Sequence, residues 1–293
     1  MIMLNKSHSA FRRPAAASKE GLPPHGRIAC DRCHGCAPVF NRTRLEAPTD
    51  TWRITANPMA WGNDRPEVLV LGFSKGPNQI RDIETNSHDD VAFKAGRANV
   101  GKVLAHVGLM RPGDPVALRT QVDAAISDQK GRFGWGSLIR CTVERHDPKK
   151  GWTSTGGKMI DGFLADPEFG QTVAENCASR FLGHLPAETK LIVMFGMGQK
   201  LGYVKSAYTT ISRARPGKWR WINEVAYWDG EVTVVHVEHF KAQGSLIPDW
   251  MGLTGADRAK YGHQAWALSI RCHARPGYCL VRETRRLRPP LPR

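Results

Sequence analysis

Three of the seven cysteines lie within seven positions of one another near the start of the chain. Residues 28–36 read IACDRCHGC, which places Cys30, Cys33 and Cys36 on one short segment. In a C-x-x-C segment, the two intervening residues let both sulfurs turn toward one ion. Structural zinc and iron–sulfur clusters each take four protein ligands. The segment therefore predicts a metal centre whose remaining ligands come from elsewhere in the chain.

Positive charge is the strongest bulk property of the sequence. Lys and Arg number 42 against 27 Asp and Glu, which gives a formal net charge of +15. The charge is grouped at 145–152, 212–221 and 282–293. Such an excess favours DNA or another nucleic acid as the partner over a membrane, because no basic amphipathic helix with a long apolar face is evident. The alternative is a soluble protein that is basic without a polyanionic partner.

Apolar residues make up 41% of the chain, and no run of them approaches the length of a membrane span. The first residues also lack the continuous apolar stretch of a signal peptide. We therefore expect a cytoplasmic monomer, in which clustered cysteines bind metal and do not form disulfides. The expected organisation is a flexible basic arm over 1–27, a single domain over 28–282 and a basic tail over 283–293.

Apolar runs of strand length alternate with helical patterns along the proposed domain. The strand-like runs are 67–74, 135–143, 189–198 and 231–240, and the helical patterns are 99–110 and 171–185. This alternation predicts an α/β fold with a mainly parallel sheet. Ligands of such sheets bind at the carboxyl ends of the strands. The segments expected there are 72–78, 139–141, 196–199 and 238–244.

Five segments, in order, resemble motifs of the uracil-DNA glycosylase superfamily, and most closely its iron–sulfur branch. They read VLVLGFSKGPNQ, VAFKAGRANVGKVLAHVGLM, LIRC, ENCASRFLGHLPAETKLIVMFGMG and VEHFKAQGS. The resemblance covers roughly residues 28 to 250. It implies a three-layer α/β/α sandwich with a central, mainly parallel four-stranded sheet. It also implies an enzyme, a DNA glycosylase that hydrolyses the N-glycosidic bond of a base.

The resemblance supplies the missing metal ligands. In the family, an N-terminal C-x-x-C joins one cysteine at a strand end and one at the start of a helix. The corresponding residues here are Cys30, Cys33, Cys141 and Cys177, and the family implies a [4Fe–4S] cluster, with structural zinc as the alternative. Cys36 competes for a ligand position. Cys272 and Cys279 lie outside the pattern and have no assigned role.

The first strand-end loop departs from the family pattern. It reads Gly72-Phe73-Ser74-Lys75-Gly76-Pro77-Asn78, without the acidic residue that positions water in the family. Ser74 takes the position of an asparagine in a related branch, and Phe73 and Asn78 are expected on the substrate side. A serine hydroxyl can hold a water but stabilises positive charge less than a carboxylate does. Asp89 and Asp90 are the expected substitutes for the acid, ahead of Asp82 and Glu84.

The remaining motifs predict how a flipped base is held. Phe93 resembles the phenylalanine on which the base stacks, and Ser137 stands where the family has a base-reading asparagine. Because serine is shorter, the pocket is expected to be roomier. His239 resembles the histidine that donates to the leaving base, with His236 as the fallback. In the KAQGS segment, Lys241 and Ser245 are expected to contact the duplex.

Together these residues predict a glycosylase that removes uracil or, because three positions differ, a modified pyrimidine such as phages use. Defence against phage DNA is the expected biological context. The first alternative is a catalytically inactive DNA-binding or damage-sensing module of the same fold. The second is a zinc-dependent nucleic-acid adaptor.

Overall fold

The computed structural model describes residues 22–154, 159–242 and 244–274. The predicted tail over 283–293 and the first 21 residues of the predicted arm lie outside the described residues. The end of that arm is part of the fold, because Leu22 is buried and Gly26 and Arg27 pair with Ala60 and Met59. The ordered domain therefore begins before residue 28, the predicted boundary.

The larger of two sheets has eight strands in the order β1–β4–β6–β5–β9–β12–β11–β10. In that order their bounds are Gly26–Arg27, Met59–Gly62, Phe133–Ser137, Val68–Gly72, Leu191–Phe195, Thr233–Val237, Ala226–Trp228 and Arg220–Asn223. The inner strands β6, β5, β9 and β12 pair in parallel. The two outer strands on each side pair antiparallel.

The predicted α/β class is therefore confirmed, but the expected four-stranded sheet is wrong. The sheet is mixed and has eight strands, because short antiparallel strands extend the parallel core at both edges. Strands β4 and β10 read MAWG and RWIN, which lack the continuous aliphatic runs by which the inner strands are recognised. The sequence pattern gave no comparable signal for these edges.

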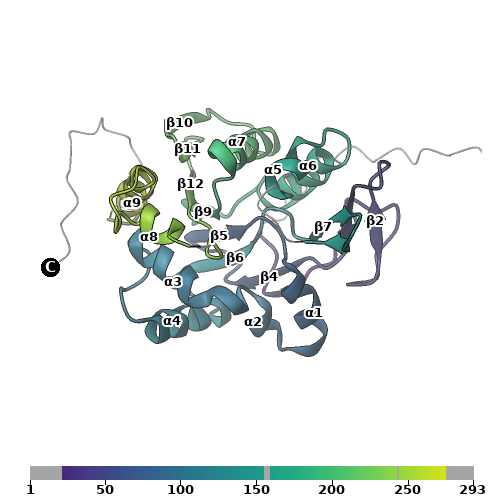
Figure 1. Cartoon of the computed structure of the whole chain (residues 1–293), viewed down its shortest axis with the longest axis horizontal. Helices are drawn as coiled ribbons and strands as arrows, with labels where there is room; N and C mark the ends of the chain where they lie inside the picture. The colour runs from purple at the N-terminus through teal and green to yellow at the C-terminus, as the bar shows by residue number, and fades with distance from the viewer. Residues whose placement is uncertain (1–21, 155–158, 243, 275–293) are drawn as a thin grey trace, which may run out of the picture.

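The smaller sheet is antiparallel and has the order β2–β3–β7–β8. Its strands are Arg44–Glu46, Trp52–Thr55, Thr142–Asp147 and Gly151–Thr153. In Figure 1 its labelled strands β2 and β7 lie at the right, apart from the larger sheet. Half of this sheet, the hairpin of β7 and β8, comes from the long segment between Cys141 and Cys177.

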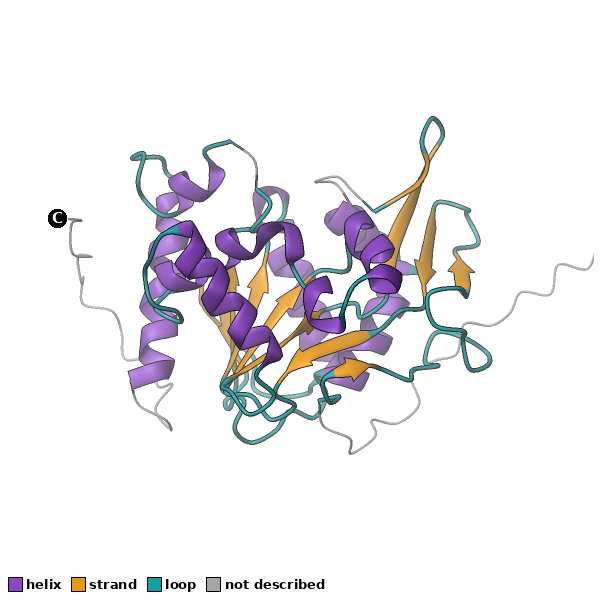
Figure 2. Cartoon of the chain, turned by 90° about the horizontal axis from the view of Figure 1, so that it is seen from below, coloured by secondary structure: helices purple, strands orange, loops and turns teal. Residues whose placement is uncertain are grey.

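Helices lie on both sides of the larger sheet, with α3 and α4 on one side and α5, α6 and α7 on the other (Figure 1). In Figure 2, helices lie in front of and behind the orange strands. The α-helices are α1 Pro77–Thr85, α2 His88–Val91, α3 Arg97–His106, α4 Pro115–Ser127, α5 Met159–Ala165, α6 Gly170–Phe181, α7 Gly202–Ala214, α8 Leu246–Trp250 and α9 Ala259–Ala274. Two short 3-10 helices, Lys94–Gly96 and Gln199–Leu201, precede α3 and α7. No helix in the described ranges is both long enough and apolar enough to cross a bilayer.

The pairing register aligns the carboxyl ends of the parallel strands, so that their last residues lie side by side. Gly72 of β5 pairs with Ser137 of β6, and Val237 of β12 pairs with Phe195 of β9. Strands β5 and β9 are buried along their whole length, as predicted for strands covered on both faces. The loops that leave these strand ends are therefore held by a rigid core.

Candidate active site and four-cysteine site

Three predicted site positions lie together at the ends of β5 and β6. A Cβ atom built on Gly72 would lie 3.7 Å from Phe93 Cε1 and 3.9 Å from Ser137 Oγ. The absence of a side chain at Gly72 therefore lets the Phe93 ring and the Ser137 hydroxyl approach the same strand end. We call Gly72, Phe93, Ser137, Gly196 and His239 the strand-end site.

Phe93 is held in a left-handed backbone conformation, with φ of 52°. This region is unfavourable for a large non-glycine residue, and such residues persist only where the surroundings fix them. The ring is 7% exposed and packs edge-on against Phe240, at 5.1 Å between centroids, and tilted against Phe195, at 6.0 Å. The Phe93 ring thus contacts one residue at the end of β9 and one just after β12. Stacking of a base on this ring stays a prediction.

His239 follows β12 and lies beside the end of β9, because a Cβ built on Gly196 would be 3.8 Å from His239 Cδ2. The Lys241 backbone N–H donates to His239 Nδ1 at 3.1 Å. This bond places the proton of the neutral ring on Nε2. Burial, with a smaller contribution from Lys241, lowers the His239 pKa to about 4. The ring is therefore a neutral hydrogen-bond donor at physiological pH.

His236 has a different environment, although it lies only three residues earlier on the same strand. The residue is fully buried, with Nδ1 3.0 Å from the Gly196 carbonyl oxygen and Nε2 3.2 Å from the Tyr227 hydroxyl. Both ring nitrogens are therefore used within the core. This geometry assigns His236 a packing role and leaves His239 as the histidine at the strand ends.

The first loop places its predicted residues in different surroundings. Phe73 is 5% exposed, and its ring packs edge-on against Phe163 of α5 and Tyr203 of α7. Ser74 is half-buried, and Asn78 lies in the first turn of α1, where its side chain is outside the described structure. Phe73 is therefore part of the core between β5 and the helices, and its predicted contact with substrate is not supported by this packing.

The two residues predicted beyond β12 lie at the surface. Lys241 and Ser245 are exposed, and the Ser245 hydroxyl donates to Asp249 Oδ2 at 2.8 Å. The Glu238 carboxylate fixes the start of this loop, since it accepts the His239 N–H at 2.9 Å and pairs with Arg258 at 2.5 Å. An exposed loop on a fixed base can reach a partner molecule without disturbing the strand ends.

The predicted acids are engaged elsewhere. Asp90 accepts a hydrogen bond from the Ser87 hydroxyl at 2.8 Å and is exposed. Glu84 accepts from the Asn41 amide at 2.9 Å, and Asp82 lies 3.8 Å from Arg81. These contacts are typical of a solvated loop. None of them places a carboxylate against the strand-end site.

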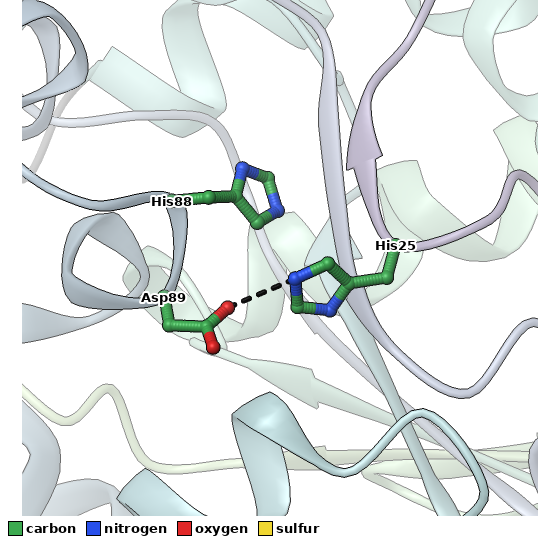
Figure 3. Close-up of side chains that lie close together, drawn as sticks. All are labelled: His25, His88 and Asp89. Carbon is green, nitrogen blue, oxygen red and sulfur yellow. Dashed lines mark ion pairs between the residues drawn. The ribbon is translucent and has the colours of Figure 1, made fainter.

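Asp89 belongs to a group with His25 and His88 whose potential ligand atoms all lie within 4.8 Å of one another (Figure 3). His25 Nε2 is 2.9 Å from Asp89 Oδ1, while His25 Nδ1 accepts the Gly62 N–H. His88 Nε2 is 2.8 Å from the Ala60 carbonyl oxygen, and its ring stacks on Trp61. These bonds to β4 already use one nitrogen of each ring. The group therefore fastens the segment before β1 and helix α2 onto the edge of the sheet.

One carboxylate near the strand ends was not predicted. Asp161 of α5 accepts the Gln199 N–H through Oδ2 at 2.9 Å, just beyond β9. Its other oxygen is buried, has no hydrogen-bond partner among the described residues, and would lie 2.5 Å from a Cβ on Gly198. Gly198, Lys200 and Leu201 all have positive φ, so the chain bends sharply around this carboxylate. The two glycines of FGMG, residues 195–198, were the sequence signal that another residue approaches the backbone closely here.

The four predicted metal ligands line one cavity, although they come from three separate segments. Cys30, Cys33, Cys141 and Cys177 share this cavity with Arg140 and Phe181 among others. Cys36 is exposed and is not among the lining residues. Among the residues that the structure describes, no three of these four sulfurs all lie within 4.8 Å of one another. We call these four residues the four-cysteine site.

Each sulfur of the four-cysteine site faces an N–H donor. The donors are the backbone N–H groups of Arg32, Asn57 and Arg140 for Cys30, Cys141 and Cys177, and the Asn176 side chain for Cys33. Burial raises the pKa of all four thiols, to about 12 for Cys33 and about 11 for Cys141. Neutral buried thiols need no such donors, whereas thiolate ligands are stabilised by them.

Two buried cations adjoin this site. Lys75 and Arg140 are each 2% exposed, and the Lys75 ammonium donates to the Arg140 carbonyl oxygen. Burial lowers the Lys75 pKa to about 8 and the Arg140 pKa to about 10. Negative charge on nearby thiolates would oppose both shifts. Cys141 and Cys177 would raise the Lys75 pKa, and Cys177 would raise the Arg140 pKa. The burial of Lys75 was not predicted, because lysine is rarely buried.

Comparisons of the chain with protein-family models, with curated proteins and with solved structures found no match. The resemblance to the uracil-DNA glycosylase superfamily thus depends on the five sequence segments, and it stays a prediction. What the structure establishes is an α/β domain with two adjacent features, a strand-end site and a four-cysteine site.

Proposed function

We propose that the chain is a DNA glycosylase that removes uracil or a modified pyrimidine. The observation that carries this proposal is His239, a neutral imidazole at the strand ends whose Nε2–H is fixed by the bond from Lys241 to Nδ1. Breaking a glycosidic bond leaves negative charge on the departing base. A neutral donor already in place can stabilise that charge without moving a proton beforehand.

Other residues of the strand-end site would hold the flipped base. An enzyme that acts on a base must take it out of the duplex and read its pairing edge. The Ser137 hydroxyl can donate or accept a hydrogen bond and leaves more room than an amide. This room favours a base that carries an extra substituent over plain uracil.

The attacking water needs a group that orients it. Ser74 is a half-buried polar residue of the first loop, and Asp161 supplies a carboxylate just beyond β9. We assign the water-orienting role to these two residues in place of Asp89 and Asp90. Asp161 also brings negative charge near the sugar, where positive charge develops as the bond breaks.

The four-cysteine site fits a [4Fe–4S] cluster. Four thiols line one cavity, each with an N–H donor, and cations lie beside them. Four thiolates suit either a cluster or structural zinc, and the resemblance of the five segments to the iron–sulfur branch favours the cluster. When bound, the cluster would tie residues 30–33 and helix α6 to the bend between β6 and β7 that contains Cys141.

DNA is the proposed partner because the net charge of +15 suits a polyanion. Binding to phosphates releases counterions, so the affinity is expected to fall steeply with salt. Lys241 and Ser245 lie on the exposed loop after His239, and this exposure supports the proposal that they contact the DNA backbone. We propose a monomer that acts in the cytoplasm against DNA carrying modified bases, such as phage DNA.

The test is an abasic-site assay on the full chain. Duplex and single-stranded DNA containing uracil or modified pyrimidines, and phage genomic DNA, are incubated with the protein and then treated with alkali. Strand breaks that depend on His239 support the proposal. Salt-sensitive binding without breaks on any substrate would favour an inactive DNA-binding module. That second candidate draws on the first loop, where no acid is present and Phe73 is packed in the core.

A further inference from the structure

We propose that Lys75 is a positioning residue that couples the four-cysteine site to the first loop of the strand-end site. Its buried ammonium group is held by the negative charge of the metal-bound thiolates, and the loop carrying Ser74 is held with it. This inference rests on the metal centre proposed above and adds a role for a residue that the family pattern does not include.

The geometry places Lys75 between the two sites. Its backbone follows Ser74 in the loop after β5, while its Nζ donates to the carbonyl oxygen of Arg140, the residue before Cys141. The neighbouring backbone runs alongside, since the Leu138 and Ile139 N–H groups donate to the Gly72 and Phe73 carbonyl oxygens at 2.8 and 2.9 Å. The segment 138–141 thus lies along the loop after β5 and ends at Cys141, one of the proposed metal ligands.

Arg140 reinforces this arrangement. Its guanidinium lies over the Phe181 ring at 5.2 Å and donates to the Trp135 carbonyl oxygen at 3.4 Å. A Cβ atom on Gly136 would overlap the guanidinium, so glycine at 136 makes the space that Arg140 occupies. The backbone N–H of Arg140 also faces the Cys177 sulfur. Arg140 therefore lines the cavity of the four cysteines, and Lys75 is held to this cation through the Arg140 carbonyl oxygen.

Neither cation pairs with a carboxylate in the described part of the chain. Arg97 provides the contrast, because it is 6% exposed and pairs with Asp123 at 2.5 Å. A buried charge without a partner is strongly unfavourable. The anionic groups within reach of Lys75 and Arg140 are the cysteines. Four metal-bound thiolates with their metal form a centre that supplies the missing negative charge.

The consequence is reciprocal. The bound centre stabilises the buried Lys75, and Lys75 stabilises the bound centre. If the centre is lost, the ammonium group loses its counter-charge and the loop at 73–76 is no longer drawn toward Cys141. The metal centre would then act on catalysis by fixing where Ser74 lies, without taking part in bond cleavage.

The experiment compares the purified full-length wild type with Lys75→Met, Lys75→Gln and the matched control Arg97→Met. Metal per chain is measured first, and then the rate at which excess chelator removes it. Hydrogen exchange of the amides of 73–76 is followed before and after metal removal. Lys75→Gln removes the charge and keeps an N–H donor, on a side chain one atom shorter, while Arg97→Met removes a buried cation that has its own carboxylate.

Both Lys75 variants are expected to lose metal at least about tenfold faster than the wild type, as for a buried charge that loses its partner. Their 73–76 amides should exchange in the loaded state as fast as those of the metal-free wild type. Arg97→Met should keep the wild-type values for both. A loaded wild type whose Lys75→Gln variant behaves identically, or an Arg97→Met variant that loses metal equally fast, overturns this inference alone. A wild type without metal overturns it together with the proposed centre.

Discussion

Replacing His239 by alanine removes a neutral donor that lies beside the ends of β9 and β12. Because its pKa is lowered to about 4, the ring is neutral at pH 7, so the lost interaction is that of an Nε2–H and not of a cation. Removing one such donor from a site of developing charge slows the chemical step on the order of 100-fold or more, which is about 2.7 kcal/mol. DNA affinity comes mostly from phosphate contacts and should hardly change.

The assay is single-turnover base excision with enzyme in excess, alongside a binding titration at fixed salt. His236→Ala is the control, since it leaves the Gly196 carbonyl and the Tyr227 hydroxyl without their partner in the core. Each loss of this kind destabilises the fold by about 1–3 kcal/mol, while the folded fraction should retain the wild-type rate. A normal excision rate in folded His239→Ala, or a loss of DNA binding equal to the loss of rate, would refute the reasoning.

Four further outcomes follow from the same structure. Cys177→Ala should lose metal and solubility together, because metal binding and folding are coupled, whereas Cys36→Ala should retain metal, as elemental analysis will show. Gly136→Ala should destabilise the protein and weaken metal retention, because the new methyl group overlaps Arg140; an unchanged melting temperature would count against this packing. The folded-state pKa of His236 is lowered to about 4 from 6.5 by burial, so the unfolded chain binds more protons between these values. Its contribution to the free energy of unfolding is present above pH 6.5 and is lost as the pH falls toward 4, on the order of 3 kcal/mol in a urea titration series. Asp161→Asn should lower single-turnover excision and leave DNA binding intact, and equal rates for Asp161→Asn and the wild type would remove Asp161 from the mechanism.

The parts of this protein that could be predicted from sequence are those with a regular hydrophobic signal. Strands β5, β9 and β12 and helices α3 and α6 carry continuous or helical apolar patterns, and they occur close to the expected ranges. The strand expected over 135–143 is wrong, because this range holds the end of β6, a bend and the start of β7, which belongs to the smaller sheet. The C-x-x-C spacing marked Cys30 and Cys33, and the family resemblance supplied Cys141 and Cys177, which line the same cavity. Local patterns of this kind predict the structure because the apolar residues that form them are the ones buried in the core.

The parts that could not be predicted depend on contacts between distant segments. Lys75 reads as an exposed loop residue, and only the fold shows that its ammonium group is buried against the segment that ends at Cys141. Asp161 lies in a segment between two cysteines whose structure had no family counterpart. Asp89 was favoured because of its position before Phe93, but tertiary packing directs it toward His25. The direction in which each of these side chains points depends on contacts with residues far away in the sequence, and these contacts cannot be predicted from the local pattern.

The order of strands in the larger sheet also bears on how this chain is made. Strand β4 pairs with β6, which ends at Ser137, and β1 pairs only with β4. The last ligand of the four-cysteine site, Cys177, is synthesised 144 residues after Cys33 (177 − 33). During translation β4 and β5 are therefore made before β6, the strand that lies between them, and Cys30 and Cys33 are made before the other two proposed ligands. Chains with exposed strands and unfilled thiols are prone to aggregate and to oxidise, so the yield of native protein should depend on the metal supply of the producing cell.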